Sequence, residues 1–480
     1  MTITVYALTD SHQECRNLCT LLSGIKHDYV SGEPFIVLDC GDIFKGIYKR
    51  ELSVDSYISF KEQYPQAQIF ITIGNNDFGF NEESFLFYKS VLKDMGDVGI
   101  NFVCANLKEV KTGEYSDIVP RYKILKIKNH KILITGFCLN TSVVNRFGYE
   151  FEDAKKSLLN LIDSVKEEYD KLIILNHHWY PHSKQLKDFA TRHGIKIDLI
   201  IGGHEHSPIR PDFKNNIYYP LAFARTLYKI NVGNKISDVK EYSLDNFKIS
   251  SEYDKFLAEY EEKVELYKPF AKRVLNLYKW YSEPCALGTF ISDNMKRVAG
   301  TDIAFHSTGF TMFPLKTDDS DVITNYDFEK VICASTPIVR MNLSVSQLKE
   351  VFSNATVNRM YKNSGNARFV QCSGNIKLTG KGNIEDKTYK IIQIEINGVE
   401  LLDKNGEPKD SEKKYSCAVD DFISKGEQGF SVLKNIARVY VKDKNGFAVQ
   451  INNLLKESLK IAQKEYKTKS EYPSFELIDL

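Results

Sequence analysis

The stretch "QIFITIGNND", residues 68–77, decides the fold because it runs from an apolar segment directly into a polar turn. Its run Ile69–Ile73 is β-branched and almost continuously apolar, as in a strand that is buried on both faces. Segments with helical spacing, such as 154–169, separate runs of this kind. The alternation predicts a layered α/β domain before about residue 245. The other strands that we predict there are residues 3–8, 35–39, 131–136, 171–175 and 197–201.

The character of the chain changes after this domain. Residues 251–280 are charged and helical in period apart from Pro269, which predicts a connecting helix broken at that proline. A surface helix of either domain is the alternative. From about residue 283, helices, strands and polar turns such as 407–414 predict a second, α+β domain. We therefore predict domains at 1–245 and 283–480 with a helical connection over 246–282.

Composition excludes several function classes. The 480 residues include 64 basic and 63 acidic side chains, so no charge imbalance indicates nucleic acid or a membrane surface as a partner. The nine cysteines are scattered without a C-x-x-C pair, which favours reduced thiols. No signal peptide or membrane-spanning run is evident, and we expect a cytoplasmic protein. The sequence does not indicate an oligomeric state.

Polar side chains follow five of the predicted strands. Parallel strands bring their carboxyl ends to one edge of a sheet, so these side chains should meet there. Alone, Asn75 would be read as a turn residue and His204 as a satisfied loop histidine. Taken together, the side chains that follow the five strands form a mixed oxygen and nitrogen set that suits Mn, Zn or Fe. If one carboxylate bridges, the set suits two ions about 3.5–4 Å apart. The candidate ligands are Asp10, His12, Asp42, Asn75, His177, His204 and His206.

These motifs resemble a known family. Asp10-x-His12, Gly41-Asp42-x3-Gly46, Gly74-Asn75-x-Asp77, His177 and Gly203-His204-x-His206 resemble the calcineurin-like metallophosphoesterase signature. Residues 286–310, 367–377 and 420–430 resemble the C-terminal domain of the two-domain 5′-nucleotidase family. The resemblance covers nearly the whole chain.

The resemblance implies a fold and a mechanism. The first domain should be a four-layer αββα sandwich, and the second an α+β substrate domain. One ion would bind Asp10, His12, Asp42 and His206, and the other Asp42, Asn75, His177 and His204. A hydroxide bridging the ions would attack phosphorus in line. His178 is the alternative to His177, which the family pattern favours.

The sequence departs from the family at the position after Asn75. The family carries a catalytic histidine there and an aspartate that orients it, where this chain has Asn76 and Gly79. Asn76 can donate a hydrogen bond to a phosphoryl oxygen but cannot protonate a leaving group. Loss of such a proton donor typically costs about 10²–10⁴ in rate. Substrates with good leaving groups should suffer least.

The second domain departs from the family as well. The arginine that holds the substrate phosphate aligns with Met312, in a loop that keeps Gly309, and the ribose-binding aspartate aligns with Gln428. One base-stacking aromatic is kept as Phe422, and the other aligns near Ala334. Phe422 and Phe430 could equally be core residues.

We therefore expect a dinuclear phosphoester hydrolase with altered specificity. Its substrate would be a small nucleotide-like phosphodiester or pyrophosphate, contacted by Asn76, Gly309 and Phe422, with Asn76 and Asp42 taking part in catalysis. Two alternatives are an ordinary 5′-nucleotidase and a metal-binding pseudoenzyme that serves as a binding module.

Overall fold

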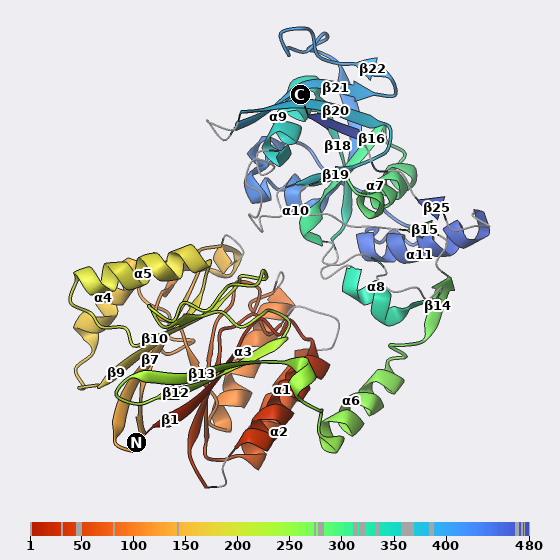
Figure 1. Cartoon of the computed structure of the whole chain (residues 1–480). Helices are drawn as coiled ribbons and strands as arrows, with labels where there is room; N and C mark the ends of the chain where they lie inside the picture. The colour runs from red at the N-terminus through yellow and green to blue at the C-terminus, as the bar shows by residue number, and fades with distance from the viewer. Residues whose placement is uncertain are drawn as a thin grey trace. The chain divides into compact units, whose positions relative to one another are not determined.

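The computed structural model has two compact units, Met1–Tyr260 and Glu261–Leu480 (Figure 1). It describes residues 2–479 except 30–31, 45–49, 80–81, 142–143, 273–274, 277–282, 311–314, 316–321, 332–335, 357–368, 384–387, 466–469, 472–473 and 475. The cysteines of the described residues form no disulfide. Within the same part of the chain, no helix has the length and apolar character needed to cross a membrane.

The first unit contains two sheets. The six-stranded sheet has the order β13-β12-β1-β2-β3-β4, and β1 to β4 run parallel. Its strands are β1 (Ile3–Leu8), β2 (Phe35–Asp39), β3 (Ala67–Thr72), β4 (Asn101–Val103), β12 (Thr226–Val232) and β13 (Ile236–Ser243). The five-stranded sheet has the order β11-β10-β9-β7-β6 and is parallel from β7 to β11. Its strands are β6 (Tyr122–Ile127), β7 (His130–Cys138), β9 (Lys171–His177), β10 (Leu199–Gly203) and β11 (Ile217–Tyr218).

Alternation along these strands builds the layers. Ile173 and Leu175 of β9 enter a core shared with β1, β2 and β3, whereas Leu172 and Ile174 pack on the other face against α4 and α5. Figure 1 shows α1 to α3 on one side of the paired sheets and α4 and α5 on the other. The predicted αββα sandwich is therefore confirmed. The helices are α1 (Cys15–Asp28), α2 (Arg50–Gln63), α3 (Glu82–Asp97), α4 (Ala154–Ser164) and α5 (Tyr180–Arg192).

Local sequence explains the limits of α4. The Asp153 side chain accepts hydrogen bonds from the amides of Lys155 and Lys156, which satisfies two amides of the first turn. The helix ends at Ser164 because Val165 is extended, earlier than the predicted limit of 169. A small ladder of β5 (Leu107–Glu109) and β8 (Tyr149–Phe151) completes the unit.

The second unit is α+β, as predicted. Its five-stranded sheet has the order β19-β16-β23-β18-β24, and its four-stranded sheet the order β22-β21-β20-β26. Helix α7 (Ala286–Ala299) ends where Gly300 takes a left-handed φ of +61°. The other helices are α8 (Asn325–Val331), α9 (Val345–Thr356), α10 (Asp421–Ser424) and α11 (Ile451–Glu465). The strands are β16 (Ile303–Ser307), β18 (Ile338–Ser344), β19 (Val370–Cys372), β20 (Ile376–Asn383), β21 (Thr388–Ile396), β22 (Val399–Glu400), β23 (Lys414–Asp420), β24 (Val439–Tyr440) and β26 (Glu476–Asp479).

The predicted connection, residues 246–282, is less helical than expected. Helix α6 (Ser251–Lys263) ends before Pro269, and Pro269 opens β14 (Pro269–Lys272), which pairs with β17 (Val322–Thr324). A proline has no amide hydrogen and fits the first position of a strand better than a helix interior. Two short strands, β15 (Leu275–Asn276) and β25 (Ser470–Glu471), form a further parallel pair.

Candidate metal centre

The predicted ligands follow parallel strands that end at the same edge of the sandwich. Asp10 and His12 follow β1, Asp42 follows β2 and Asn75 follows β3. His177 is the last residue of β9, and His204 and His206 follow β10. The topology therefore brings side chains from across the first unit to one place.

Four of these residues have unusual backbone conformations. The φ angles are +47° at Asp10, +46° at His12, +56° at Asp42 and +71° at His204. Side chains other than glycine rarely take positive φ, and such strain collects at functional sites. Backbone hydrogen bonds hold it here: the Asp10 amide donates to Gly41 O at 2.9 Å and the His12 amide to Asp42 O at 3.0 Å.

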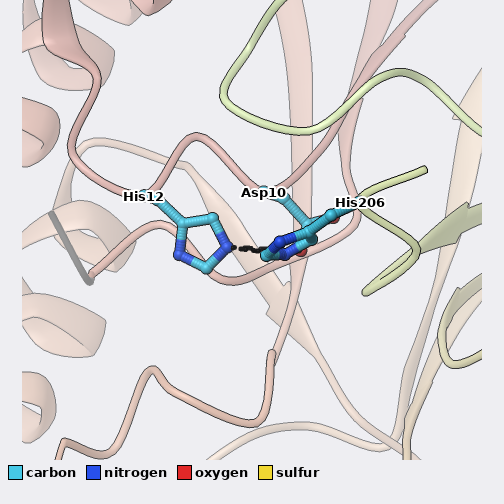
Figure 2. A group of neighbouring side chains, drawn as sticks. All are labelled: Asp10, His12 and His206. Atoms are coloured by element: carbon cyan, nitrogen blue, oxygen red, sulfur yellow. Dashed lines mark hydrogen bonds and ion pairs between the residues drawn. The ribbon is translucent and has the colours of Figure 1, made fainter. Parts of the chain in front are cut away.

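Asp10, His12 and His206 form the first group of converging side chains (Figure 2). The Nε2 atoms of His12 and His206 lie 3.0 Å apart. The Oδ1 atom of Asp10 lies 3.7 Å from the first of these nitrogens and 3.5 Å from the second. One carboxylate and two imidazoles thus offer ligand atoms to one point.

Asp42, His177 and His204 form the second group. His177 Nε2 lies 3.5 Å from Asp42 Oδ2 and 3.2 Å from the Asn75 side-chain oxygen, so Asn75 joins this group. Asp42 Oδ2 is also 3.8 Å from His12 Nε2, which places this carboxylate between the two groups. A bridging ligand would need that position.

His178, the alternative to His177, lies elsewhere. Its ring stacks on His182 with ring centroids 3.6 Å apart, and its Nδ1 accepts a hydrogen bond from the Trp179 amide. It is not part of either group of converging side chains. The geometry therefore favours His177, in agreement with the sequence pattern.

The site suits metal ions on several counts. His204 Nε2 is buried and has no hydrogen-bond partner among the described residues, although a buried polar atom normally has one. His177 Nδ1 lies 2.6 Å from Cys40 O, which orients the ring with Nε2 toward Asp42, as second partners do at metal-binding histidines. Carboxylate, amide oxygen and imidazole ligands suit Mn, Zn or Fe.

Glycines make the close approach of the loops possible. A Cβ at Gly74 would lie 2.1 Å from Asp42 Oδ1, and one at Gly203 would lie 2.5 Å from Thr9 Oγ1. Both contacts are too short for any side chain. The glycines next to the candidate ligands are therefore required by space.

Buried opposite charges control protonation in the centre. Burial raises the pKa of Asp10, but His177, His206 and His12 outweigh this effect and hold it at about 2. Burial lowers the pKa of His177, but the carboxylates of Asp42 and Asp10 outweigh that effect and raise it to about 10. Burial also lowers the pKa of His204, to about 3. Both aspartates are thus ionised near neutral pH, as metal ligands must be.

Asn76 lies against the central carboxylate. Its amide nitrogen donates to Asp42 Oδ1 at 2.8 Å, and its side-chain Nδ2 donates to Asp42 Oδ2 at 2.5 Å. Gly79 has a φ of +70°, and its amide donates to Asn76 O at 3.0 Å. Where the family carries its histidine and aspartate, this chain has a neutral amide and a tight glycine turn.

Asp77 has a structural role that sequence reasoning missed. Its Oδ1 accepts hydrogen bonds from the amides of Ile43 at 2.9 Å and Phe44 at 3.2 Å. Its Oδ2 accepts from the amides of Asp42 at 3.0 Å and Gly74 at 2.7 Å. One buried carboxylate therefore joins the loop after β2 to the loop after β3. In the sequence, the signal for this role was the position of Asp77 two residues after Asn75.

The candidate substrate residues of the second unit have ordinary environments. The Gly309 amide donates to Ser307 Oγ at 3.1 Å, and Gln428 Oε1 accepts from the same hydroxyl at 2.8 Å. Phe430 is fully buried in the core, whereas Phe422 packs against that core and stays partly exposed. The predicted positions Gly46, Met312 and Ala334 lie outside the described residues.

Comparisons with known proteins agree with this architecture. The model of the calcineurin-like phosphoesterase family matches residues 3–208, and that of the 5′-nucleotidase C-terminal domain matches residues 264–435. The chain belongs to the two-domain 5′-nucleotidase family. Calcineurin-like metallophosphoesterases use divalent metal ions, so the family and the converging ligands are consistent.

Individual relatives are distant. The chain is 30% identical over 198 residues to an apyrase of Anopheles gambiae, covering 38% of this chain and 31% of the relative. It is 22% identical over 488 residues to the trifunctional nucleotide phosphoesterase protein YfkN of Bacillus subtilis, covering 90% of this chain and 32% of that protein. It thus spans about a third of the length of these two relatives. A solved 5′-nucleotidase precursor from Thermus thermophilus has the same fold, with a TM-score of 0.76, 17% identity, and 100% and 99% of the two chains covered.

Proposed function

We propose that the protein hydrolyses a phosphodiester or pyrophosphate bond in a nucleotide-related small molecule, with two divalent ions as cofactors. The first ion would be held by Asp10, His12, Asp42 and His206, and the second by Asp42, Asn75, His177 and His204. Mn, Zn and Fe all suit these ligands. When bound, such ions stabilise the negative charge that develops on a phosphoryl group.

The position of the Asn76 side chain carries the proposal. Its Nδ2 donates to Asp42 Oδ2, so the amide lies at the carboxylate between the two ligand groups. From there it can donate a hydrogen bond to a phosphoryl oxygen. An amide has no proton to give to a leaving alkoxide, which favours substrates whose leaving group departs without help. Phosphodiesters with acidic leaving groups and phosphate anhydrides meet this requirement.

Departures in the second unit support a substrate other than an ordinary nucleoside monophosphate. Gln428 accepts a hydrogen bond from Ser307 and is neutral where the family carries an aspartate. Met312 replaces the phosphate-binding arginine in sequence. Phe422 packs against the core of this unit and keeps part of its surface exposed.

The test is hydrolysis of a nitrophenyl phosphomonoester and of the bis-nitrophenyl diester by purified protein with Mn²⁺. We expect cleavage of the diester, and its loss in Asp42→Asn. Preference for the monoester would instead favour an ordinary 5′-nucleotidase. Metal binding without hydrolysis of either compound or of a panel of nucleotide anhydrides would favour a binding module.

Substitution of Asn76 tests its role directly. Asn76→His places an imidazole beside Asp42 and should raise the rate of monoester hydrolysis by about 10- to 100-fold. This is a fraction of the rate gain of about 10²–10⁴ that a positioned proton donor usually supplies. Asn76→Ala is the matched control, because it removes the amide without supplying a proton donor. Equal monoester rates in the two variants would place Asn76 outside the substrate's reach.

A further inference from the structure

A polar cavity lies at the opposite end of β9 and β10 from the metal centre. Its volume is about 580 Å³, within the range of about 300–1,000 Å³ typical of small-molecule sites. The wall is formed by the beginnings of β9 and β10, by α5, by the loop before β11 and by the turn between β12 and β13. Lys171 and His177 are the two ends of β9. Six residues at roughly 3.3 Å each separate the cavity from the metal ligands by about 20 Å.

The cavity is strongly basic. Five lysines and one acidic side chain line it: Lys171, Lys187, Lys196, Lys214, Lys235 and Asp198. Asp198 Oδ1 lies 2.9 Å from Lys196 Nζ and 3.6 Å from Lys171 Nζ, and its Oδ2 accepts the Leu172 amide. Lys214 and Lys235 are exposed and have no ion pair among the described residues. Most of the positive charge is therefore not neutralised.

Two of the ammonium groups are built into the wall. The Lys171 side chain is only 10% exposed, and its Nζ donates to Asn234 O at 3.2 Å. Lys187 Nζ donates to Ile197 O, and burial lowers the pKa of this half-buried lysine. An ammonium group has three donors, so each keeps donors beyond its backbone contact. An anion in the cavity would compensate the cost of burying these charges.

An aromatic ring stands beside the lysines. Phe213 is 63% exposed, and its ring packs edge-to-face with Tyr218, with centroids 5.9 Å apart. A flat base could stack on this ring while its charged part reaches the lysines.

We propose that this cavity binds a polyphosphate group, carried by a nucleoside polyphosphate or present as the free inorganic chain. Four excess positive charges and several unused N–H donors fit an oligoanion better than a single carboxylate. Phe213 adds an exposed ring on which a base can stack. The site is independent of the metal centre and of the hydrolysis proposed there.

Calorimetric titration of the full-length protein with inorganic tripolyphosphate and with adenosine 5′-(β,γ-imido)triphosphate tests the proposal. Lys214→Glu/Lys235→Glu is the informative variant, because both side chains are exposed and unpaired and the change should leave folding intact. The matched control is Lys111→Glu/Lys248→Glu, two exposed lysines of the same unit with the same change in net charge. We expect at least about tenfold weaker binding in the first variant, since each solvent-exposed charge contact is worth roughly fivefold in affinity.

Amide hydrogen exchange locates the binding. Ligand should slow exchange in residues 210–216 and 233–236 in the wild-type protein and not in the variant. Phe213→Ala distinguishes the two forms of the ligand. It should weaken binding of the nucleotide analogue alone if a base stacks on the ring, and binding of neither ligand if the inorganic chain is the natural one. Equal affinities in the two double variants, or protection confined to the metal-binding loops, would overturn the proposal.

Discussion

Asp77→Asn should loosen the metal-binding loops without removing any candidate ligand. The Asp77 carboxylate accepts four backbone hydrogen bonds, two on each oxygen, from Asp42, Ile43, Phe44 and Gly74. An asparagine keeps one acceptor oxygen, so neither orientation of its amide restores more than two of the four. Two lost bonds leave two buried amides without partners, which costs about 2–6 kcal/mol at about 1–3 kcal/mol each. The NH₂ group would also face two N–H donors.

Amide hydrogen exchange measures this loosening where it occurs. Exchange in residues 41–44 and at residue 74 should become roughly 30- to 10⁴-fold faster, as the lost free energy implies. The control is Asp97→Asn, which makes the same chemical change at a side chain that is 64% exposed and paired with Lys93. Such surface pairs contribute little to stability. Exchange at residues 41–44 that matched the control would refute the role that we assign to Asp77.

Two further predictions concern a glycine and a buried carboxylate. Gly203→Ala should lower the metal content of purified protein, measured by elemental analysis, because its Cβ would stand 2.5 Å from Thr9 Oγ1 and 2.9 Å from His177 Nδ1. The control is Gly96→Ala, which has open space at its Cβ. Equal metal content in the two variants would contradict the argument. Burial raises the pKa of Glu152, but hydrogen bonds from two hydroxyls and two lysines outweigh it and lower the pKa from 4.5 to about 2. Because the folded-state pKa is the lower one, this carboxylate stabilises the fold above about pH 4.5 and loses that effect as the pH falls toward 2. Urea denaturation should find Glu152→Gln less stable by roughly 1–2 kcal/mol at pH 7, because solvent screens part of the interaction, with a difference that shrinks below pH 4.5. A difference independent of pH would mean that ionisation is not its source.

The central strands were predictable because their composition is unambiguous. The runs at 3–8 and 35–39 form β1 and β2 with the predicted bounds, since strands covered on both faces have almost no polar positions. β6, β12 and β13 were not predicted. The burial patterns of β6 and β13 alternate or are mostly exposed, as expected at or near the edge of a sheet, and short amphipathic segments of this kind do not differ clearly from loops. β12 is largely buried, but lysine and asparagine interrupt its apolar run.

The site was predictable for a topological reason. Parallel strands end at one edge, so order along the chain was enough to bring Asp10 and His206 together despite their separation in sequence. The hydrogen bonds of Asp77 depend instead on how closely two loops approach, which no local pattern encodes. The choice between a core role and a ligand contact for Phe430 likewise depended on tertiary packing, and the structure places it in the core.

The wide spread of the converging side chains along the chain has a consequence for biosynthesis. The two groups draw on residues from Asp10 to His206, and neither is complete without a residue of the 204–206 segment. A nascent chain therefore cannot assemble either group until that segment has left the ribosome, about 10–40 s after synthesis begins at roughly 5–20 residues per second. Until then, the early imidazoles and carboxylates emerge as separate, weak ligands. Both groups therefore form late in synthesis, after most of the first unit has been made.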